Sequence, residues 1–243
     1  MDGAAAVALI DATRGTWRVG SFLEALPSAA LRALVTAGEP VRFHRAERLL
    51  EEGATGTDVF LLLSSFVKVT AGTGDSEALL ALRGGGDVVG EVAARDGGPR
   101  TATVTACGQE PVRAVRLSAQ ALERCLTDRP EVRLRLERMV LGKLRSATLR
   151  RTDNSSTRAR TRLARVLVAM AEDFGTPLRG STVIHVDLTH VEWGTMISCS
   201  EKTVERAMAD LARDGLVERN RKRPIVRDLE ALRALAYDGG PSL

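Results

Sequence analysis

The 243-residue sequence contains few aromatic residues and no long apolar run. Phe, Tyr and Trp make up 3% of it, so a core has to be built mainly from Leu, Val and Ala. No run approaches the roughly eighteen apolar residues that a membrane-spanning helix needs. The N-terminal AAAVALI also lacks the basic flank of a signal peptide. We therefore expect a cytoplasmic protein.

Cysteine and histidine are scarce as well. Cys107, Cys125 and Cys199 are far apart and lack CxxC spacing, which argues against a disulfide framework, a zinc site and an iron–sulfur cluster. We expect them to be small buried residues, and we expect His44 to be a surface residue of an edge strand, not a haem ligand. The three histidines show no motif spacing with Ser, Cys or Asp, so the sequence predicts no catalytic residues, no metal ligands and no enzyme.

Charge is divided unevenly along the chain. Residues 1–128 hold 13 Lys and Arg against 16 Asp and Glu, whereas residues 129–243 hold 22 against 15. DNA attracts positively charged surfaces through its phosphates. The C-terminal half is therefore the half expected to bind DNA.

The most informative segment is GEVAARDGGPRTATV, residues 90–104. Arg100 offers a planar fork for two phosphate oxygens, and Thr101 adds a hydroxyl. Glu91 only accepts hydrogen bonds when ionised, so beside a phosphate it suits a ribose hydroxyl. Small residues in tight turns can direct backbone N–H groups at an anion. The glycines that can form such a nest are Gly84, Gly85, Gly86, Gly90, Gly97 and Gly98.

This segment resembles the phosphate-binding cassette of cyclic-nucleotide-binding domains, whose pattern is G-E-[LV]-A, a short turn and P-R-[ATS]-A-[TS]-V. The resemblance implies that a cyclic nucleotide, cyclic AMP or a related one, is the effector, with no other cofactor. Its ligand-binding residues would be Gly90, Glu91, Val92, Ala93, Arg100 and Thr101. The alternative is a solvated turn with a surface pair of arginine and glutamate.

The surrounding pattern predicts an α+β fold. Residues 21–35 have helical apolar spacing, and residues 41–119 then form short strand-like runs broken by glycine turns. Such runs are typical of a double-sheeted jelly roll, and they resemble the cyclic-nucleotide-binding β-roll. Ser65 departs from that family, which has glycine before the next strand.

A long helix is predicted after the roll, with Pro130 in its first turn. Its apolar arc is too wide for one partner. We expect one side to contact the roll and the other to contact a second subunit; the alternative is a buried helix in a monomer. One side comprises Val132, Leu136, Met139 and Val140. The other comprises Leu134, Leu141, Leu144 and Thr148.

Residues 189–211 predict a helix-turn-helix. Thr189 and Glu192 have capping-box spacing, and Ser198-Cys199-Ser200 forms the turn before a second helix that starts at Glu201. Val191, Met196 and Ile197 are expected in a small core. The second helix would bury Val204, Ala207, Met208 and Leu211. Strand-like LVE and PIV then flank a basic hairpin tip that contains Arg219, Arg221, Lys222 and Arg223.

This order of elements resembles the Crp/Fnr family of bacterial transcription regulators over residues 20–235. The resemblance implies a homodimer that binds double-stranded DNA at an inverted repeat and contacts RNA polymerase, with Ala147 and Thr148 facing the purine. We expect a β-roll at 20–128, a dimerisation helix at 129–151, a hinge at 152–157 and a winged helix-turn-helix at 158–237. The expected DNA-binding residues are Thr189, Ser200, Glu201, Lys202, Glu205, Arg206, Arg221, Lys222 and Arg223.

The departures from the family concern specificity. Known cyclic-AMP responders pair two adjacent hydroxyl residues where this chain has Ala147-Thr148. Glu201 replaces the arginine, and Lys202 the glutamate, of the usual recognition helix, so an altered operator is expected; Arg206 is kept. Ser198 replaces a glycine in the turn. A ligand-independent DNA-binding regulator, with the roll serving only as a dimer scaffold, stays open as the alternative.

Overall fold

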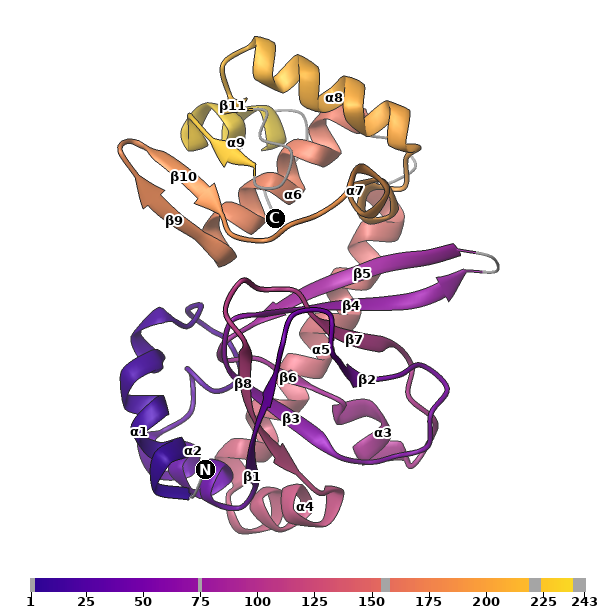
Figure 1. Cartoon of the computed structure of the whole chain (residues 1–243). Coiled ribbons are helices and arrows are strands. Elements are labelled where there is room, and N and C mark those ends of the chain that lie inside the picture. The colour runs from indigo at the N-terminus through magenta and orange to yellow at the C-terminus, as the bar shows by residue number, and fades with distance from the viewer. Residues whose placement is uncertain (1–2, 74–75, 154–157, 219–223, 238–243) are drawn as a thin grey trace. The chain divides into compact units, whose positions relative to one another are not determined.

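The computed structural model describes residues 3–73, 76–153, 158–218 and 224–237. Its contacts divide the chain into two compact units, Met1–Leu144 and Arg145–Leu243 (Figure 1). The predicted α+β fold, with an antiparallel roll followed by a helix-turn-helix, is confirmed. Within the described residues, no helix is both long enough and apolar enough to span a bilayer.

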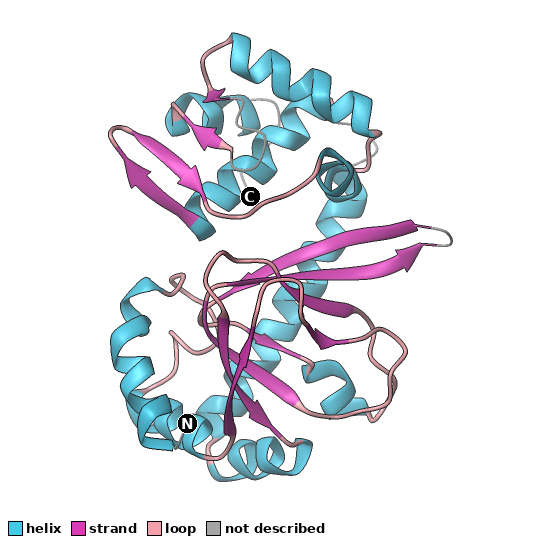
Figure 2. Cartoon of the chain, in the orientation of Figure 1, coloured by secondary structure: helices cyan, strands magenta, loops and turns pink. Residues whose placement is uncertain are grey.

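The first unit contains a roll of two antiparallel sheets and flanking helices (Figure 2). The strand orders are β1-β8-β3-β6 and β2-β7-β4-β5. The strands are β1 (Glu39–Phe43), β2 (Arg48–Leu50), β3 (Val59–Ser64), β4 (Phe66–Thr73), β5 (Ser76–Gly84), β6 (Val88–Val89), β7 (Thr103–Ala106) and β8 (Val112–Leu117). The helices are α1 (Gly3–Thr13), the 3₁₀ turn η1 (Arg14–Thr16), α2 (Ser28–Thr36), α3 (Glu91–Asp96), α4 (Ala119–Asp128) and α5 (Pro130–Asp153), whose residues from Arg145 on belong to the second unit.

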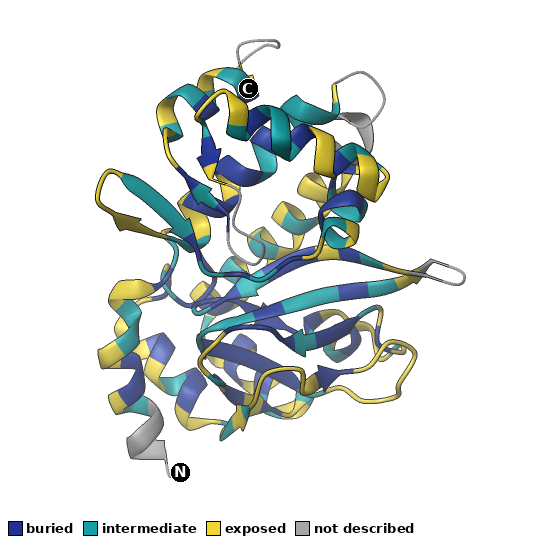
Figure 3. Ribbon diagram, turned by 45° about the horizontal axis from the view of Figure 1, so that its top comes forward, coloured by how far each residue is buried: buried dark blue, intermediate teal, exposed yellow. Residues whose placement is uncertain are grey.

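Strand β3 is buried on both faces, which explains its unbroken apolar sequence VFLLL. Phe60 and Leu62 belong to the core between the sheets, where Phe43 and Phe60 pack edge to face with ring centroids 5.6 Å apart. Leu61 and Leu63 belong to the core beneath the helices. In Figure 3 buried residues lie at the centre of the unit, and many of the exposed residues lie on loops and helix surfaces.

The helix expected over residues 21–35 is shorter than predicted, because α2 begins at Ser28. Pro27 precedes it in an extended conformation with ψ 144°, and a residue followed by proline is disfavoured in the helical region. The segment before Pro27 therefore forms turns. Helix α1 was not predicted from the sequence.

Ser65 has φ 63°, the left-handed conformation for which the family uses glycine. Its Oγ donates to Glu110 O at 2.7 Å, a hydrogen bond that offsets part of the backbone cost. The departure at Ser65 therefore leaves the turn in place.

Helix α5 starts at Pro130, in the first turn as predicted, and runs two residues into the predicted hinge. The rest of that hinge, residues 154–157, lies outside the described residues. Val132 and Leu136 are buried in the helical core and Met139 packs against it. The other side of the helix exposes Leu134, Leu141 and Leu144, at 47%, 61% and 64%.

The second unit packs helices against a small antiparallel sheet with strand order β11-β12-β10-β9. Its helices are α6 (Ala159–Phe174), α7 (His190–Ile197), α8 (Glu201–Arg213) and α9 (Leu229–Tyr237). Its strands are β9 (Gly175–Leu178), β10 (Ser181–Ile184), β11 (Val217–Glu218) and β12 (Ile225–Val226). The hairpin of β9 and β10 turns at Arg179 and Gly180, both with positive φ.

Candidate effector site and DNA interface

Gly90 links β6 to the short helix α3 with φ 87°, a left-handed conformation. A Cβ on Gly90 would lie 2.7 Å from Asp58 O and 3.0 Å from Arg100 Nη1. Both distances are too short for a side chain, so this position needs glycine. The turn thus brings the backbone of residue 90 close to the arginine of the cassette.

Arg100 is buried, with only 6% of its surface exposed. Its Nη1 donates to Gly90 O at 3.0 Å and its Nη2 to Asp58 O at 2.7 Å. Burial lowers the pKa of Arg100, while the nearby carboxylates of Asp58 and Glu91 oppose that shift. A guanidinium has more N–H donors than these two bonds use. Arg100 is therefore fixed by the backbone and retains donors for an anion.

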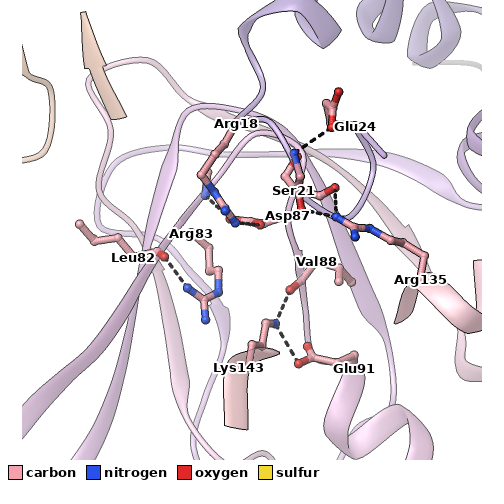
Figure 4. A network of polar contacts seen from close by, with 12 residues as sticks. Arg18, Ser21, Glu24, Leu82, Arg83, Asp87, Val88, Glu91, Arg135 and Lys143 are labelled. Carbon is pink, nitrogen blue, oxygen red and sulfur yellow. Dashed lines mark hydrogen bonds and ion pairs between the residues drawn. The ribbon is translucent and has the colours of Figure 1, made fainter. Parts of the chain in front are cut away.

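Glu91 is also buried, at 5% exposure, and it forms an ion pair that the sequence analysis missed. Lys143 Nζ on α5 lies 2.9 Å from Glu91 Oε1 and donates to Val88 O at 3.0 Å (Figure 4). Burial lowers the pKa of Lys143, and Glu91 opposes this. The available signal was helical spacing: Lys143 lies at i+7 from the buried Leu136, on the core side of α5.

The structure brings together Gly90, Glu91 and Arg100, three of the predicted ligand-binding residues. Ala93 is buried at 2%, whereas Val92 and Thr101 are exposed. Ala147 and Thr148 are exposed residues of α5 that belong to the second compact unit.

The glycine nest is smaller than predicted. Gly84 N donates to Asp87 Oδ2 and Gly86 N to Leu62 O. Gly97 N donates to Ala93 O and Gly98 N to Asp96 Oδ1. These four N–H groups therefore already donate to acceptors of the chain itself.

The helix-turn-helix begins with the capping box expected at Thr189. Thr189 N donates to Glu192 Oε2 at 2.7 Å, and Glu192 N donates to Thr189 Oγ1 at 3.2 Å. Val191, expected in the core, is 52% exposed, and Trp193 is buried at 2% instead. The core of α7 is therefore built on Trp193 and Ile197, one helical turn apart.

The turn between α7 and α8 is held by close backbone packing. Cys199 N donates to Gly194 O at 2.9 Å, and a Cβ on Gly194 would lie 2.5 Å from Cys199 O. Ser198 has φ 51°, the left-handed conformation in which the family's glycine is free of strain. Arg162 of α6, not predicted, donates from Nε to Ile197 O at 2.9 Å and lies 2.8 Å from Cys199 Sγ.

Helix α8 presents charge on its outer side. Ser200 is its N-cap, accepting from Thr203 N at 3.3 Å. The buried residues are Val204, Ala207 and Leu211, and Met208 is half-buried. Glu201, Lys202, Glu205 and Arg206 are all exposed. The predicted basic tip with Arg219, Arg221, Lys222 and Arg223 lies outside the described residues.

Family comparisons match both units. Residues 40–129 match the model of the cyclic nucleotide-binding domain, and residues 161–235 match that of the Crp-like helix-turn-helix domain. The chain is 33% identical over 216 residues to a CRP-like cAMP-activated global transcriptional regulator of Mycobacterium tuberculosis, covering 88% of this chain and 95% of the relative.

Two Thermus thermophilus proteins are also similar. One is a cyclic AMP receptor protein, 28% identical over 208 residues, which are 85% of this chain and 88% of the relative. The other is a solved structure of a CRP/FNR family transcriptional regulator, with TM-score 0.68 and 24% identity over 82% of this chain and 98% of that one. The solved structure supports the fold.

Proposed function

Because the chain belongs to the Crp/Fnr family of transcription regulators, we propose that it is a homodimer that binds a cyclic nucleotide in its roll and thereby modulates operator binding. The proposed functional regions remain the roll at 20–128, the dimerisation helix at 129–151, the hinge at 152–157 and the winged helix-turn-helix at 158–237. RNA polymerase is the proposed partner at promoters.

The observation that carries the effector proposal is the buried Arg100 beside Gly90 and Glu91. A buried guanidinium with unused donors is suited to a phosphate, because a charge-assisted fork is strong where water is excluded. A carboxylate nearby is suited to ribose hydroxyls. Val92, Ala93 and Thr101 complete the proposed phosphate and ribose site, and Ala147 and Thr148 the proposed purine contacts. Cyclic AMP or a related nucleotide is the proposed effector.

The ligand-independent alternative also has an observation in its favour. Arg100 already bonds two carbonyl oxygens and Glu91 already pairs with Lys143, so both side chains are held by the chain itself without a ligand. Calorimetry with cyclic AMP and cyclic GMP separates the two functions. Saturable heat with either nucleotide supports the effector site, and its absence with both at millimolar concentration supports the scaffold.

Homodimerisation is proposed from the exposed leucines of α5. Leu134, Leu141 and Leu144 lie on the side of the helix opposite its buried residues. A stripe of large apolar side chains along one helix is suited to a two-fold partner that presents the same stripe.

DNA readout is proposed for the exposed face of α8, together with Thr189 and Ser200 near the helix starts and Arg221, Lys222 and Arg223 at the wing. Arg206→Ala is expected to weaken specific binding by about 1–3 kcal/mol and to relax one G·C preference per half-site, because arginine forks onto guanine O6 and N7. In vitro selection from random DNA with both proteins measures this.

A matched control is Arg213→Ala at the other end of α8, where the exposed arginine pairs with Asp210. It should leave the selected sequence unchanged. Selection of the same symmetric motif by wild type and Arg206→Ala would contradict the base-reading role. Glu201 and Lys202 should shift the consensus away from the family's usual palindrome, TGTGA–TCACA, since the two charges are exchanged relative to the family.

A further inference from the structure

The segment between η1 and α2 packs against the turn that leads into the cassette. We call residues 17–24 the N-terminal strap. Trp17, 5% exposed, donates from Nε1 to Leu63 O at 2.9 Å. Leu23 N donates to Gly86 O at 2.8 Å, and Arg18 pairs with Asp87 at 3.6 Å. The strap is therefore bonded to the 84–87 turn by side chains and by backbone.

Two glycines of that turn make room for the strap. A Cβ on Gly85 would lie 2.9 Å from Trp17 Cδ1, and a Cβ on Gly86 would overlap Ser21 Oγ. Gly86 also has φ 91°. The turn and the strap thus fit each other without spare volume, so a shift of one displaces the other.

Helix α5 holds both the strap and the cassette from its core side. Arg135 Nη2 donates to Ser21 O at 3.0 Å and also to Gly20 O. Two turns further along the helix, Lys143 binds Val88 O and Glu91. Figure 4 shows the two basic side chains of α5 reaching these partners. One helix face therefore connects the strap to the proposed ribose-binding carboxylate.

This junction is not fully satisfied. Among the described residues, Ser21 Oγ and Arg135 Nε are buried and have no hydrogen-bond partner. A buried polar atom without a partner destabilises the arrangement that holds it. Two such atoms reduce the free-energy difference between this arrangement and one in which the strap has shifted. A small movement of the strap, the turn or the helix can supply them with hydrogen-bond partners.

We infer that the N-terminal strap is a coupling element of the effector switch: a ligand at the cassette displaces the 84–87 turn, and the strap transmits that displacement to α5 through Arg135. The inference rests on the proposed function. The strap residues do not belong to the proposed ligand site, so their effect on affinity measures coupling. Linkage requires the effect to be reciprocal: the ligand alters the strap, and a strap variant alters ligand affinity.

Trp17 makes the strap observable, because the chain has only two tryptophans. In full-length Trp193→Phe protein, Trp17 is the single tryptophan emitter. Cyclic AMP is titrated while heat and Trp17 emission are recorded on the same sample. We expect the emission to shift with the same midpoint as the heat, since Trp17 packs on the turn that moves.

Arg135→Met tests the connection to α5. It should change cyclic AMP affinity about 5-fold or more, in the range of typical couplings, whereas Arg32→Met, an exposed arginine of α2, should not. Trp17→Phe is the second variant if Arg135→Met does not fold, since it keeps a six-membered aromatic ring in the strap and loses the pyrrole ring with the Leu63 hydrogen bond and the contact to Gly85. A lower melting temperature alone would indicate a structural role.

The possible results distinguish a failure of the coupling inference from a failure of the proposed effector function. If Trp193→Phe protein binds cyclic AMP without any shift of Trp17 emission, and the affinity is unchanged in Arg135→Met and in Trp17→Phe, the coupling is overturned and the effector site is kept. Wild type that gives no heat overturns both. A matched emission shift together with altered affinity supports the coupling.

Discussion

Arg100→Ala is expected to weaken cyclic nucleotide binding by about 2 kcal/mol or more, roughly 30-fold in the dissociation constant. The bound phosphate would lie in a buried site without its counter-charge. The variant also leaves Gly90 O and Asp58 O without the donors that they have in wild type. Calorimetry with cyclic AMP, alongside a thermal melt, measures affinity and stability separately.

Two further variants help to interpret the result for Arg100→Ala. Arg95→Ala removes an exposed arginine that pairs with Glu123 at the surface, and it should bind like wild type. Arg100→Lys keeps the positive charge but loses the planar fork, so its affinity should lie between those of Arg95→Ala and Arg100→Ala. Binding by folded Arg100→Ala at wild-type affinity would place the ligand elsewhere than the cassette.

Leu141→Glu is expected to convert the dimer into monomers. The leucine is 61% exposed in the single chain, and in the proposed symmetric interface each copy would bury one new carboxylate without a partner, which is costly. Light scattering should change from about twice the chain mass to the 26.1 kDa of one chain. DNA binding should be lost with the dimer, since a monomer has one recognition helix and can contact only one half-site.

Gln120→Glu is the matched control, because it adds the same charge on the exposed surface of α4. It should remain dimeric. Wild type that scatters as a 26.1 kDa particle at micromolar concentration would contradict the dimer and leave the leucine stripe unexplained.

Features encoded within a few residues were predictable from the sequence. The capping box at Thr189, the start of α5 at Pro130 and the closeness of Arg100 to Gly90 all depend on short spacings whose geometry is set by the backbone. The left-handed turn at Ser198 was predictable for the same reason: the position in the motif determines φ.

Features that depend on a distant partner were not predictable. Lys143 is a lysine on an amphipathic helix, and only the fold shows that it faces Glu91, 52 residues earlier. Trp17 bonds a carbonyl 46 residues away. Glycines that were expected to bind phosphate instead accommodate the N-terminal strap, because a glycine-rich turn predicts a close approach without saying what approaches.

The close packing at Gly194 has a consequence for dimers that contain one variant and one normal subunit. A Cβ there would lie 2.5 Å from the carbonyl oxygen of Cys199 and displace the start of α8, whereas residue 194 itself belongs to neither the roll nor the leucine stripe. In the proposed dimer, a subunit with a bulky residue at this position would still pair with a normal one and occupy half of a complex that cannot read both half-sites. When such a variant is expressed beside the wild-type chain, it is expected to act as a dominant negative.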